Sequence, residues 1–465
     1  MIVAAGASLC ALGLGFPCGL VAGLYRFPAR RLMLAALAVP LLMPAFLWAI
    51  GLSMLRIELG LSRNGFLSGA SGSIWSFAAL ATPLVVFAVL VAVRLLPGTA
   101  IDAARLAGGE RAVLRYAGYA ALPAGVTACL LGGILSLSDP GPGQILGFSG
   151  VATQILISFS ALYDFELAAQ QGLVTAAIVL LAASPLIWLV ARHLTLALLP
   201  REVRLMEPRS SRTADWAGPA LFGVTLLMAL LAPVAGLAQP VLSELWLDSV
   251  VTTVARTGGN TLFYSAVAGL VATASAVPLA ICATRVASLR ASLLAGLLLI
   301  LVLPPAVGAL GTVLMASEAP VWLDPIFRSR FTVAAVLGLR LTAIPTVVLM
   351  RAIGSAPASW ALAGALHGVP LLTYLRRVLA PFLAGPIFMS IALVALVATA
   401  DITTVLLLQP PGQDSLSIAL FTVMANAPES MVASLCLAYL LLGCLVIGAL
   451  MFLMSLKGRL PRVGR

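Results

Sequence analysis

Long apolar segments, separated by short loops rich in arginine, set the pattern of this chain. The hydrocarbon core of a bilayer is about 30 Å thick, so a membrane-spanning helix needs roughly 20 apolar residues. The first apolar segment is longer than a signal-peptide core and follows no charged region, so we expect a retained helix. Segments of sufficient length predict eleven spans, at 2–25, 32–55, 73–95, 122–138, 169–191, 217–238, 259–283, 291–315, 331–351, 382–400 and 430–456.

Composition supports an all-α polytopic membrane protein. The chain is 62% hydrophobic and only 9% charged, whereas soluble domains carry about 25% charged residues. Its net charge of +11 does not indicate nucleic acid, because the basic residues are spread between apolar spans and form no basic stripe with interleaved aromatics. The six cysteines lie in apolar segments without a CxxC pair, which favours packing over metal binding or disulfides.

The basic residues are concentrated in alternate loops. One set of loops and the C-terminal tail hold 21 of the 27 basic residues, and the opposite set holds Arg56, Arg63, Arg256, Arg328 and Arg330. Cytoplasmic loops carry the excess of Lys and Arg in membrane proteins. We therefore expect a cytoplasmic C-terminus, an N-terminus outside, and Arg340 inside a span.

An internal repeat joins two distant loops. Landmarks recur about 260 positions apart in both halves of the chain, which indicates a duplicated unit: Pro97 with Pro357, Asp102-Ala103-Ala104 with Leu362-Ala363-Gly364, Gly108 with Gly368, Pro44 with Pro304, and Asp139 with Asp401. We expect a first half at 1–200, a cytoplasmic linker at 201–215 and a second half at 216–465. Both loops fall on the cytoplasmic side, so the repeat is parallel, whereas many secondary transporters carry inverted repeats.

The repeated loops resemble a known motif. Asp102-Ala103-Ala104-x-x-x-Gly108, followed by Leu122-Pro123, is similar to the EAA loop of bacterial ATP-binding-cassette (ABC) importer permeases, Glu-Ala-Ala-x-x-x-Gly and then Leu-Pro. The second loop, 357–381, keeps the usual spacing from Gly368 to Pro381 but has Leu362 at the acidic position and Gly364 at the second alanine. The resemblance implies a type I importer fold with a coupling helix in each half, and it leaves the ionic contact of the second loop in question.

The same resemblance implies the partners and the membrane. They are two cytoplasmic ABC ATPase subunits, one extracytoplasmic solute-binding protein and the bacterial cytoplasmic (inner) membrane. ATP and Mg²⁺ would sit on the ATPases, because the single lysine, Lys457, precedes Gly-Arg-Leu and forms no P-loop. We expect no cofactor, metal or catalytic residue in this chain, since His193 and His367 are predicted at the cytoplasmic face and no HExxH or GxSxG motif occurs.

The cargo stays open at the level of sequence. Two fused halves resemble the ferric-iron and thiamine branch, and 401–412 is similar to a segment of iron-type members, which makes ferric iron the first expectation. Thiamine, a polyamine or an organophosphonate are alternatives, and a secondary transporter or channel with parallel repeats is the competing class. Asp139, Asp401 and Arg340 are candidates for the substrate path, because charge near membrane depth is costly. Loop capping for the carboxylates, at the outer mouth, and pairing with an acid for Arg340 are the structural alternatives.

Overall fold

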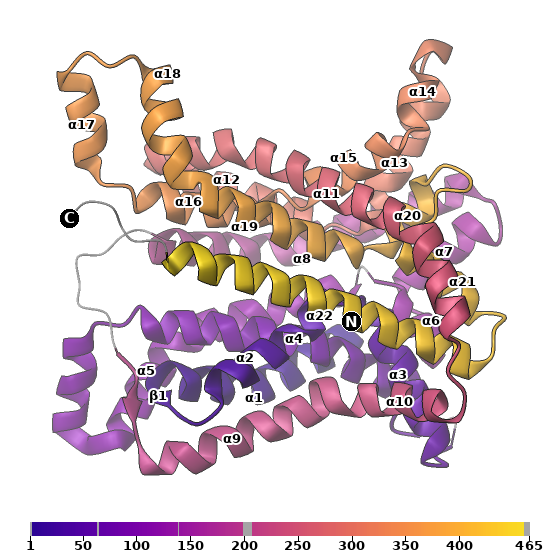
Figure 1. Ribbon diagram of the computed structural model, residues 1–465, viewed down its shortest axis with the longest axis horizontal. Coiled ribbons are helices and arrows are strands. Elements are labelled where there is room, and N and C mark those ends of the chain that lie inside the picture. Colours follow the sequence, from indigo (N-terminus) through magenta and orange to yellow (C-terminus); the bar gives the residue numbers. More distant parts are fainter. Residues whose placement is uncertain (1, 63–64, 138, 199–206, 460–465) are drawn as a thin grey trace.

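The chain forms an elongated bundle of helices that run roughly along one direction (Figure 1). The computed structural model describes residues 2–62, 65–137, 139–198 and 207–459. Eight of the described helices are long and apolar enough to cross a membrane, or ten if each of two bent pairs counts as one span. The chain is therefore an all-α, multi-pass membrane protein, with somewhat fewer continuous spans than the eleven predicted.

The described residues of the first half, up to 198, form eight α-helices, one short 3-10 turn and a two-residue strand. They are α1 (Ile2–Leu24), β1 (Tyr25–Arg26), α2 (Arg30–Ala38), η1 (Pro40–Leu42), α3 (Ala45–Glu58), α4 (Gly69–Arg94), α5 (Gly98–Leu137), α6 (Gly141–Leu146), α7 (Val151–Ser160) and α8 (Phe165–Leu198).

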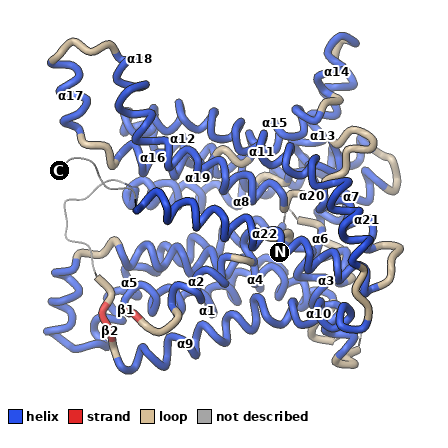
Figure 2. Tube along the Cα trace, in the orientation of Figure 1, coloured by secondary structure: helices blue, strands red, loops and turns tan. Residues whose placement is uncertain are grey.

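The rest of the described chain begins with β2 and ends with a long helix. It contains β2 (Arg209–Ser210), α9 (Arg212–Leu226), η2 (Leu227–Leu231), α10 (Ala232–Ser243), α11 (Leu247–Arg285), α12 (Ala287–Val302), α13 (Pro305–Glu318), η3 (Val321–Leu323), α14 (Asp324–Phe327), α15 (Arg330–Arg340), α16 (Ala343–Gly354), α17 (Ala358–Leu366), α18 (Leu371–Tyr374), η4 (Leu375–Leu379), α19 (Ala380–Thr399), α20 (Ile402–Leu408), α21 (Leu416–Met424) and α22 (Glu429–Arg459). Figure 2 shows how few residues lie outside helices.

Three predicted spans are broken, and proline explains the breaks; kinks at Pro44, Pro304 and Pro305 were expected from the sequence. The span 32–55 is divided into α2, η1 and α3 around Pro40 and Pro44. The span 291–315 is bent by 84° between α12 and α13, where Pro304 and Pro305 lie, and 331–351 is bent by 56° between α15 and α16. A proline has no N–H for the helix ladder and clashes with the carbonyl four residues before it, which places the effect of Pro345 at Leu341.

The repeat recurs in the element boundaries and in the packing. Helix α3 begins at Ala45 and ends at Glu58, and α13 begins and ends 260 residues later, at Pro305 and Glu318. In the first half α1 packs against α4 and α5, and in the second α11 packs against α15, α16 and α19. Glycines allow the close approach of α1 to α4: a Cβ built on Gly19 would lie 2.6 Å from a backbone oxygen of α4.

The segment α9–η2–α10 follows the linker in sequence but packs on the first half. The tilted rings of Phe222 of α9 and Phe27 have their centroids 5.5 Å apart. The π-helical turn η2 also contacts α4, because its Met228 carbonyl accepts a hydrogen bond from Trp75. Conversely, α8 of the first half packs on α12 of the second half. Residues 201–206 of the predicted linker lie outside the described residues, and Arg209–Ser210 pair in parallel with Tyr25–Arg26.

Candidate functional site

The two repeated loops lie at the same end of the bundle (Figure 1). In the first, α5 has a break at Gly108 (φ −160°) and Gly109 (φ 66°, ψ −157°). The sequence predicts that this helix stops at the pair Gly108-Gly109, and the break lies there. Gly109 has the positive φ, in a conformation essentially restricted to glycine. The two consecutive glycines in the sequence were the available signal.

In the second loop α17 ends in a Schellman motif. The Val369 N–H donates to the Gly364 carbonyl at 2.9 Å, and the Gly368 N–H donates to the Ala365 carbonyl at 3.1 Å. This motif needs a residue in the left-handed conformation after the helix, and Gly368 supplies it with φ 63°. The glycine at the predicted position therefore stops the helix and turns the chain toward α18.

Each loop presents a matched apolar side chain to the outside. Leu106 is 91% exposed and Leu366, which lies 260 positions later, is 86% exposed. The predicted motif positions match as well: Ala103 and Ala363 are exposed, and Ala104 and Gly364 are half-buried. The two loops therefore expose an apolar side chain at repeat-equivalent places. The two leucines were missed at the sequence level, although the 260-residue offset marks them.

A polar network holds the first loop. Asp102 forms ion pairs with Arg105 and with Arg209 of β2, with 3.3 Å between the guanidinium nitrogen and the carboxylate oxygen in each. The Arg105 Nε donates to Glu110 at 2.6 Å, and the Tyr25 hydroxyl donates to the same carboxylate at 2.6 Å. Burial, reinforced by Glu110, raises the pKa of Tyr25. Tyr25 therefore stays protonated as a donor, and the acid at the motif position ties the loop to the linker strand.

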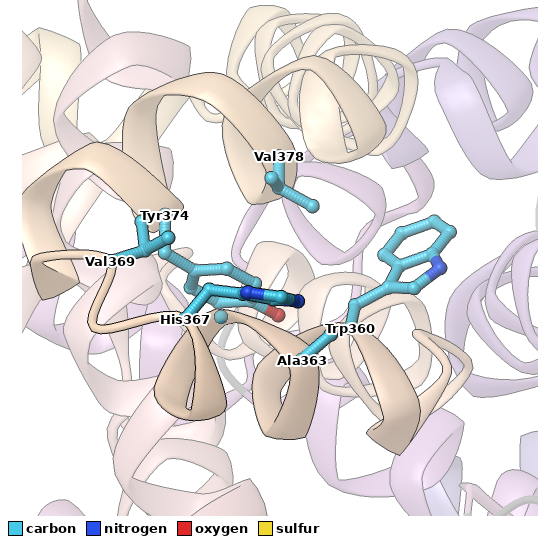
Figure 3. A pocket seen from close by; sticks show the side chains of 7 residues that line it. Trp360, Ala363, His367, Val369, Tyr374 and Val378 are labelled. Atoms are coloured by element: carbon cyan, nitrogen blue, oxygen red, sulfur yellow. The ribbon is translucent and has the colours of Figure 1, made fainter.

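The second loop is held by apolar packing around a notch of about 330 Å³. Figure 3 shows His367 and Tyr374 pointing toward Trp360 across this notch. The Trp360 ring also packs edge-on against Phe382 of α19, with the ring centroids 5.4 Å apart. Leu362, which replaces the acid, is 64% exposed. The loops thus share their helix ends but differ in the chemistry that holds them.

The three candidate path residues gather near the junction of the halves. The Arg340 guanidinium, at the end of α15, donates to the Asp401 carboxylate at 2.6 Å. Asp139, between α5 and α6, interacts electrostatically with both of these groups. Two carboxylates and one guanidinium leave a formal charge of −1 if all three are ionised. The residue 260 positions before Arg340 is Leu80, so the repeat places a cation on one side only.

Both carboxylates also cap the turns that follow them. Asp401 accepts a hydrogen bond from the Thr404 N–H at 2.9 Å, and Asp139 accepts one from the Gly141 N–H at 2.9 Å. The structure therefore shows the contacts of the structural alternatives: Asp139 and Asp401 cap turns, and Arg340 pairs with an acid. Asp401 makes these contacts inside the protein, since its side chain is only 8% exposed.

Comparison with known proteins adds no family. No protein-family model matches the chain, and no curated protein matches it. Within the described ranges, no group of three or more His, Cys, Asp or Glu side chains is arranged to hold a metal ion.

Proposed function

We propose that this chain is the permease subunit of an ATP-driven importer with a type I fold. The observation that carries the proposal is the pair of loops at one end of the bundle, with Leu106 and Leu366 exposed at positions 260 residues apart. Two such loops need two similar docking partners. The resemblance to EAA loops gives those partners as two cytoplasmic ABC ATPase subunits, which hydrolyse ATP outside this chain.

The proposed mechanism is alternating access in the bacterial cytoplasmic membrane. A solute-binding protein docks on the outer face, at the end opposite the two loops, and ATP binding closes the two ATPases. Closure is transmitted by α17 and by the first turns of α5 to the spans that follow them. A partner shifts such an equilibrium only through contacts that differ between the two states, and the exposed leucines are where we place those contacts.

We propose a cationic cargo, with ferric iron as the first candidate. The resemblance of 401–412 to iron-type members favours iron, and the formal charge of Asp139, Asp401 and Arg340 favours a cation in general. Thiamine and polyamines share this sign. An organophosphonate carries the opposite sign and is the least compatible of the four alternatives, because like charges at low dielectric repel strongly.

The competing class is a secondary transporter or channel with parallel repeats. Such a protein needs no stoichiometric partner at the loop end, so exposed leucines at repeat-equivalent positions would have no role in it. The importer requires contact at both loops.

The test is co-purification from the native host with loop variants. Burying a leucine contributes about 1.5–3 kcal/mol, so Leu106→Glu and Leu366→Glu should each weaken retention of an ATPase subunit by roughly tenfold or more. Leu242→Glu is the matched control, because Leu242 is also 86% exposed but lies near the end of α10, at the opposite end of the bundle (Figure 1). Equal retention by the loop variants and the control would overturn the proposal.

A further inference from the structure

Four arginines gather at one corner of the first half, at the end of the bundle that carries the first loop (Figure 2). Arg26 lies in β1 directly after α1, and Arg94 is the last residue of α4. Arg30 and Arg31 are the first two residues of α2. We name Arg26, Arg30, Arg31 and Arg94 the arginine cluster.

Close packing of three helix ends brings these residues together. A Cβ built on Gly23, near the end of α1, would lie 2.7 Å from the Val93 side chain, so the ends of α1 and α4 are in contact. The Arg30 Nε donates a hydrogen bond to the Ala22 carbonyl at 3.0 Å, which holds the guanidinium from α2 beside Gly23. The cluster is therefore built on the ends of α1 and α4 and the start of α2.

The positive charge of the cluster is not balanced by the protein that the structure describes. No ion pair between described residues includes any of the four arginines. Burial lowers the pKa of Arg30, and repulsion from the other three arginines lowers it further. The Nε of the half-buried Arg94 is covered and has no hydrogen-bond partner among the described residues. Partly buried like charges are costly unless an anion compensates them.

The repeat distinguishes the cluster from an ordinary helix end. Arg30 has a counterpart in Arg290, whose Nε and Nη2 donate to the Ala283 and Thr284 carbonyls at 2.7 and 3.1 Å at the end of α11. The residues 260 positions after the other three arginines are Val286, Ala291 and Gly354. Hydrogen bonding to a helix end therefore explains Arg30 and Arg290, but not the three additional charges of the first half.

The start of α2 adds backbone donors at the same place. Ala29 precedes the helix in the left-handed conformation, with φ 56°, and provides no side-chain cap. The first turn of α2 contains no acid. The N–H groups at the start of a helix carry partial positive charge and bind phosphate oxygens. Leu32, next to Arg31, is 71% exposed, so an apolar surface borders the charged one.

We propose that the arginine cluster and the first turn of α2 bind an anionic phosphate group. Guanidinium groups match phosphate oxygens with paired hydrogen bonds. The headgroup of an anionic phospholipid and inorganic phosphate share this chemistry. The position favours the lipid, because Arg94 ends a span, Leu32 offers an apolar surface to an acyl chain, and basic pockets between membrane helices bind anionic headgroups. The proposal rests on the packing of the first half and is independent of the proposed function.

The test is native mass spectrometry of the purified full chain in a neutral detergent, with phosphatidylglycerol, phosphatidylcholine or inorganic phosphate added. Arg26→Gln and Arg94→Gln each remove one charge, and Arg26 is exposed, so its replacement disturbs no buried contact. Arg94→Lys keeps the charge without the planar fork of donors. Arg285→Gln is the matched control, because Arg285 is an exposed arginine in the last turn of α11, the counterpart of α1.

The wild type should retain phosphatidylglycerol in preference to phosphatidylcholine. Each Gln variant of the cluster should weaken that binding about fivefold, Arg94→Lys should weaken it less, and Arg285→Gln should leave it unchanged. Phosphatidylglycerol should also raise the thermal midpoint of the wild type more than that of Arg26→Gln.

The free anion and the lipid are distinguished by which ligand follows the variants. Binding of inorganic phosphate that falls in Arg26→Gln and Arg94→Gln, with no such fall for the lipid, would assign the free anion to the site. Equal retention of the two lipids without phosphate binding would overturn the proposal. Equal losses of ligand in the cluster variants and in Arg285→Gln would overturn it as well.

Discussion

Replacing Arg340 with methionine tests whether the ion pair at the junction of the halves stabilises the fold. The Asp401 side chain is 8% exposed and the Arg340 side chain 17% exposed, with 2.6 Å between the charged atoms. Removing one partner of a buried pair leaves an uncompensated charge and costs about 3–5 kcal/mol. Arg340→Met should therefore lower the unfolding midpoint markedly.

The second member of the pair provides the matched variant. Asp401→Asn removes the carboxylate charge but keeps a side-chain oxygen for the Thr404 N–H, and Asn is as good an N-cap as Asp. Because a buried pair replaced by neutral groups is often close to neutral in stability, Arg340→Met/Asp401→Asn should recover most of the loss. We expect a coupling free energy of about 2–3 kcal/mol, within the range for contacting residues.

The assay is unfolding in detergent micelles, followed by tryptophan fluorescence, for the wild type, both single variants and the double variant. Additive losses in the double variant would refute the reasoning, because the charges would then act independently. An unchanged midpoint in Arg340→Met would refute it as well.

Three further predictions concern the two loops and the contact between α3 and α10. Gly109→Val and Gly368→Val should impair the coupling of ATP hydrolysis to transport, since each forces a β-branched residue to positive φ at a cost of about 1–3 kcal/mol, while Gly118→Ala, in open space within α5, should not. Glu110→Gln should increase hydrogen exchange around 98–110 at neutral pH and leave 358–368 unchanged. Glu110 lies in the loop before the apolar part of α5, and the hydrogen bond from Arg105 lowers its pKa. The stability that the Glu110 carboxylate gives to the loop is therefore fully present above pH 4.5, its ordinary pKa, and is lost as the pH falls through the lowered pKa. Gly51→Leu should prevent stable folding, measured as loss of the monodisperse peak in size-exclusion chromatography, because it displaces α10.

The sequence predicted the parts of the fold that depend on apolar length and on repetition. Helices α1, α4, α11 and α22 lie where long apolar segments were found, because a bilayer imposes a minimum length whatever the tertiary contacts. Pro304 and Pro305 indicated the kink in 291–315. The break in 331–351 was not predicted, since Pro and Gly are tolerated inside spans and only the neighbours decide whether the helix bends. The packing of α9–α10 on the first half was equally out of reach, because sequence order does not indicate which half a helix covers.

The candidate site shows the same division. Gly368 ends α17 as its position in the repeat implied, because a helix end needs a left-handed residue that glycine adopts at little cost. In the first loop the helix breaks at Gly108-Gly109, and only the backbone geometry shows that Gly109 is the glycine with positive φ. The partner of Arg340 could be predicted only as an acid, because Asp401 is 61 residues away and is brought to it by the packing of α15 against α20.

The most direct test of the central claim is the subunit composition of the complex purified from native membranes under mild conditions. Native mass spectrometry should give two ATP-hydrolysing subunits for each copy of this chain. The variant Leu106→Glu/Leu366→Glu should lose both, and Leu242→Glu should keep both. A wild-type chain that purifies without any nucleotide-hydrolysing subunit, yet carries out solute transport driven by an ion gradient, would contradict the account.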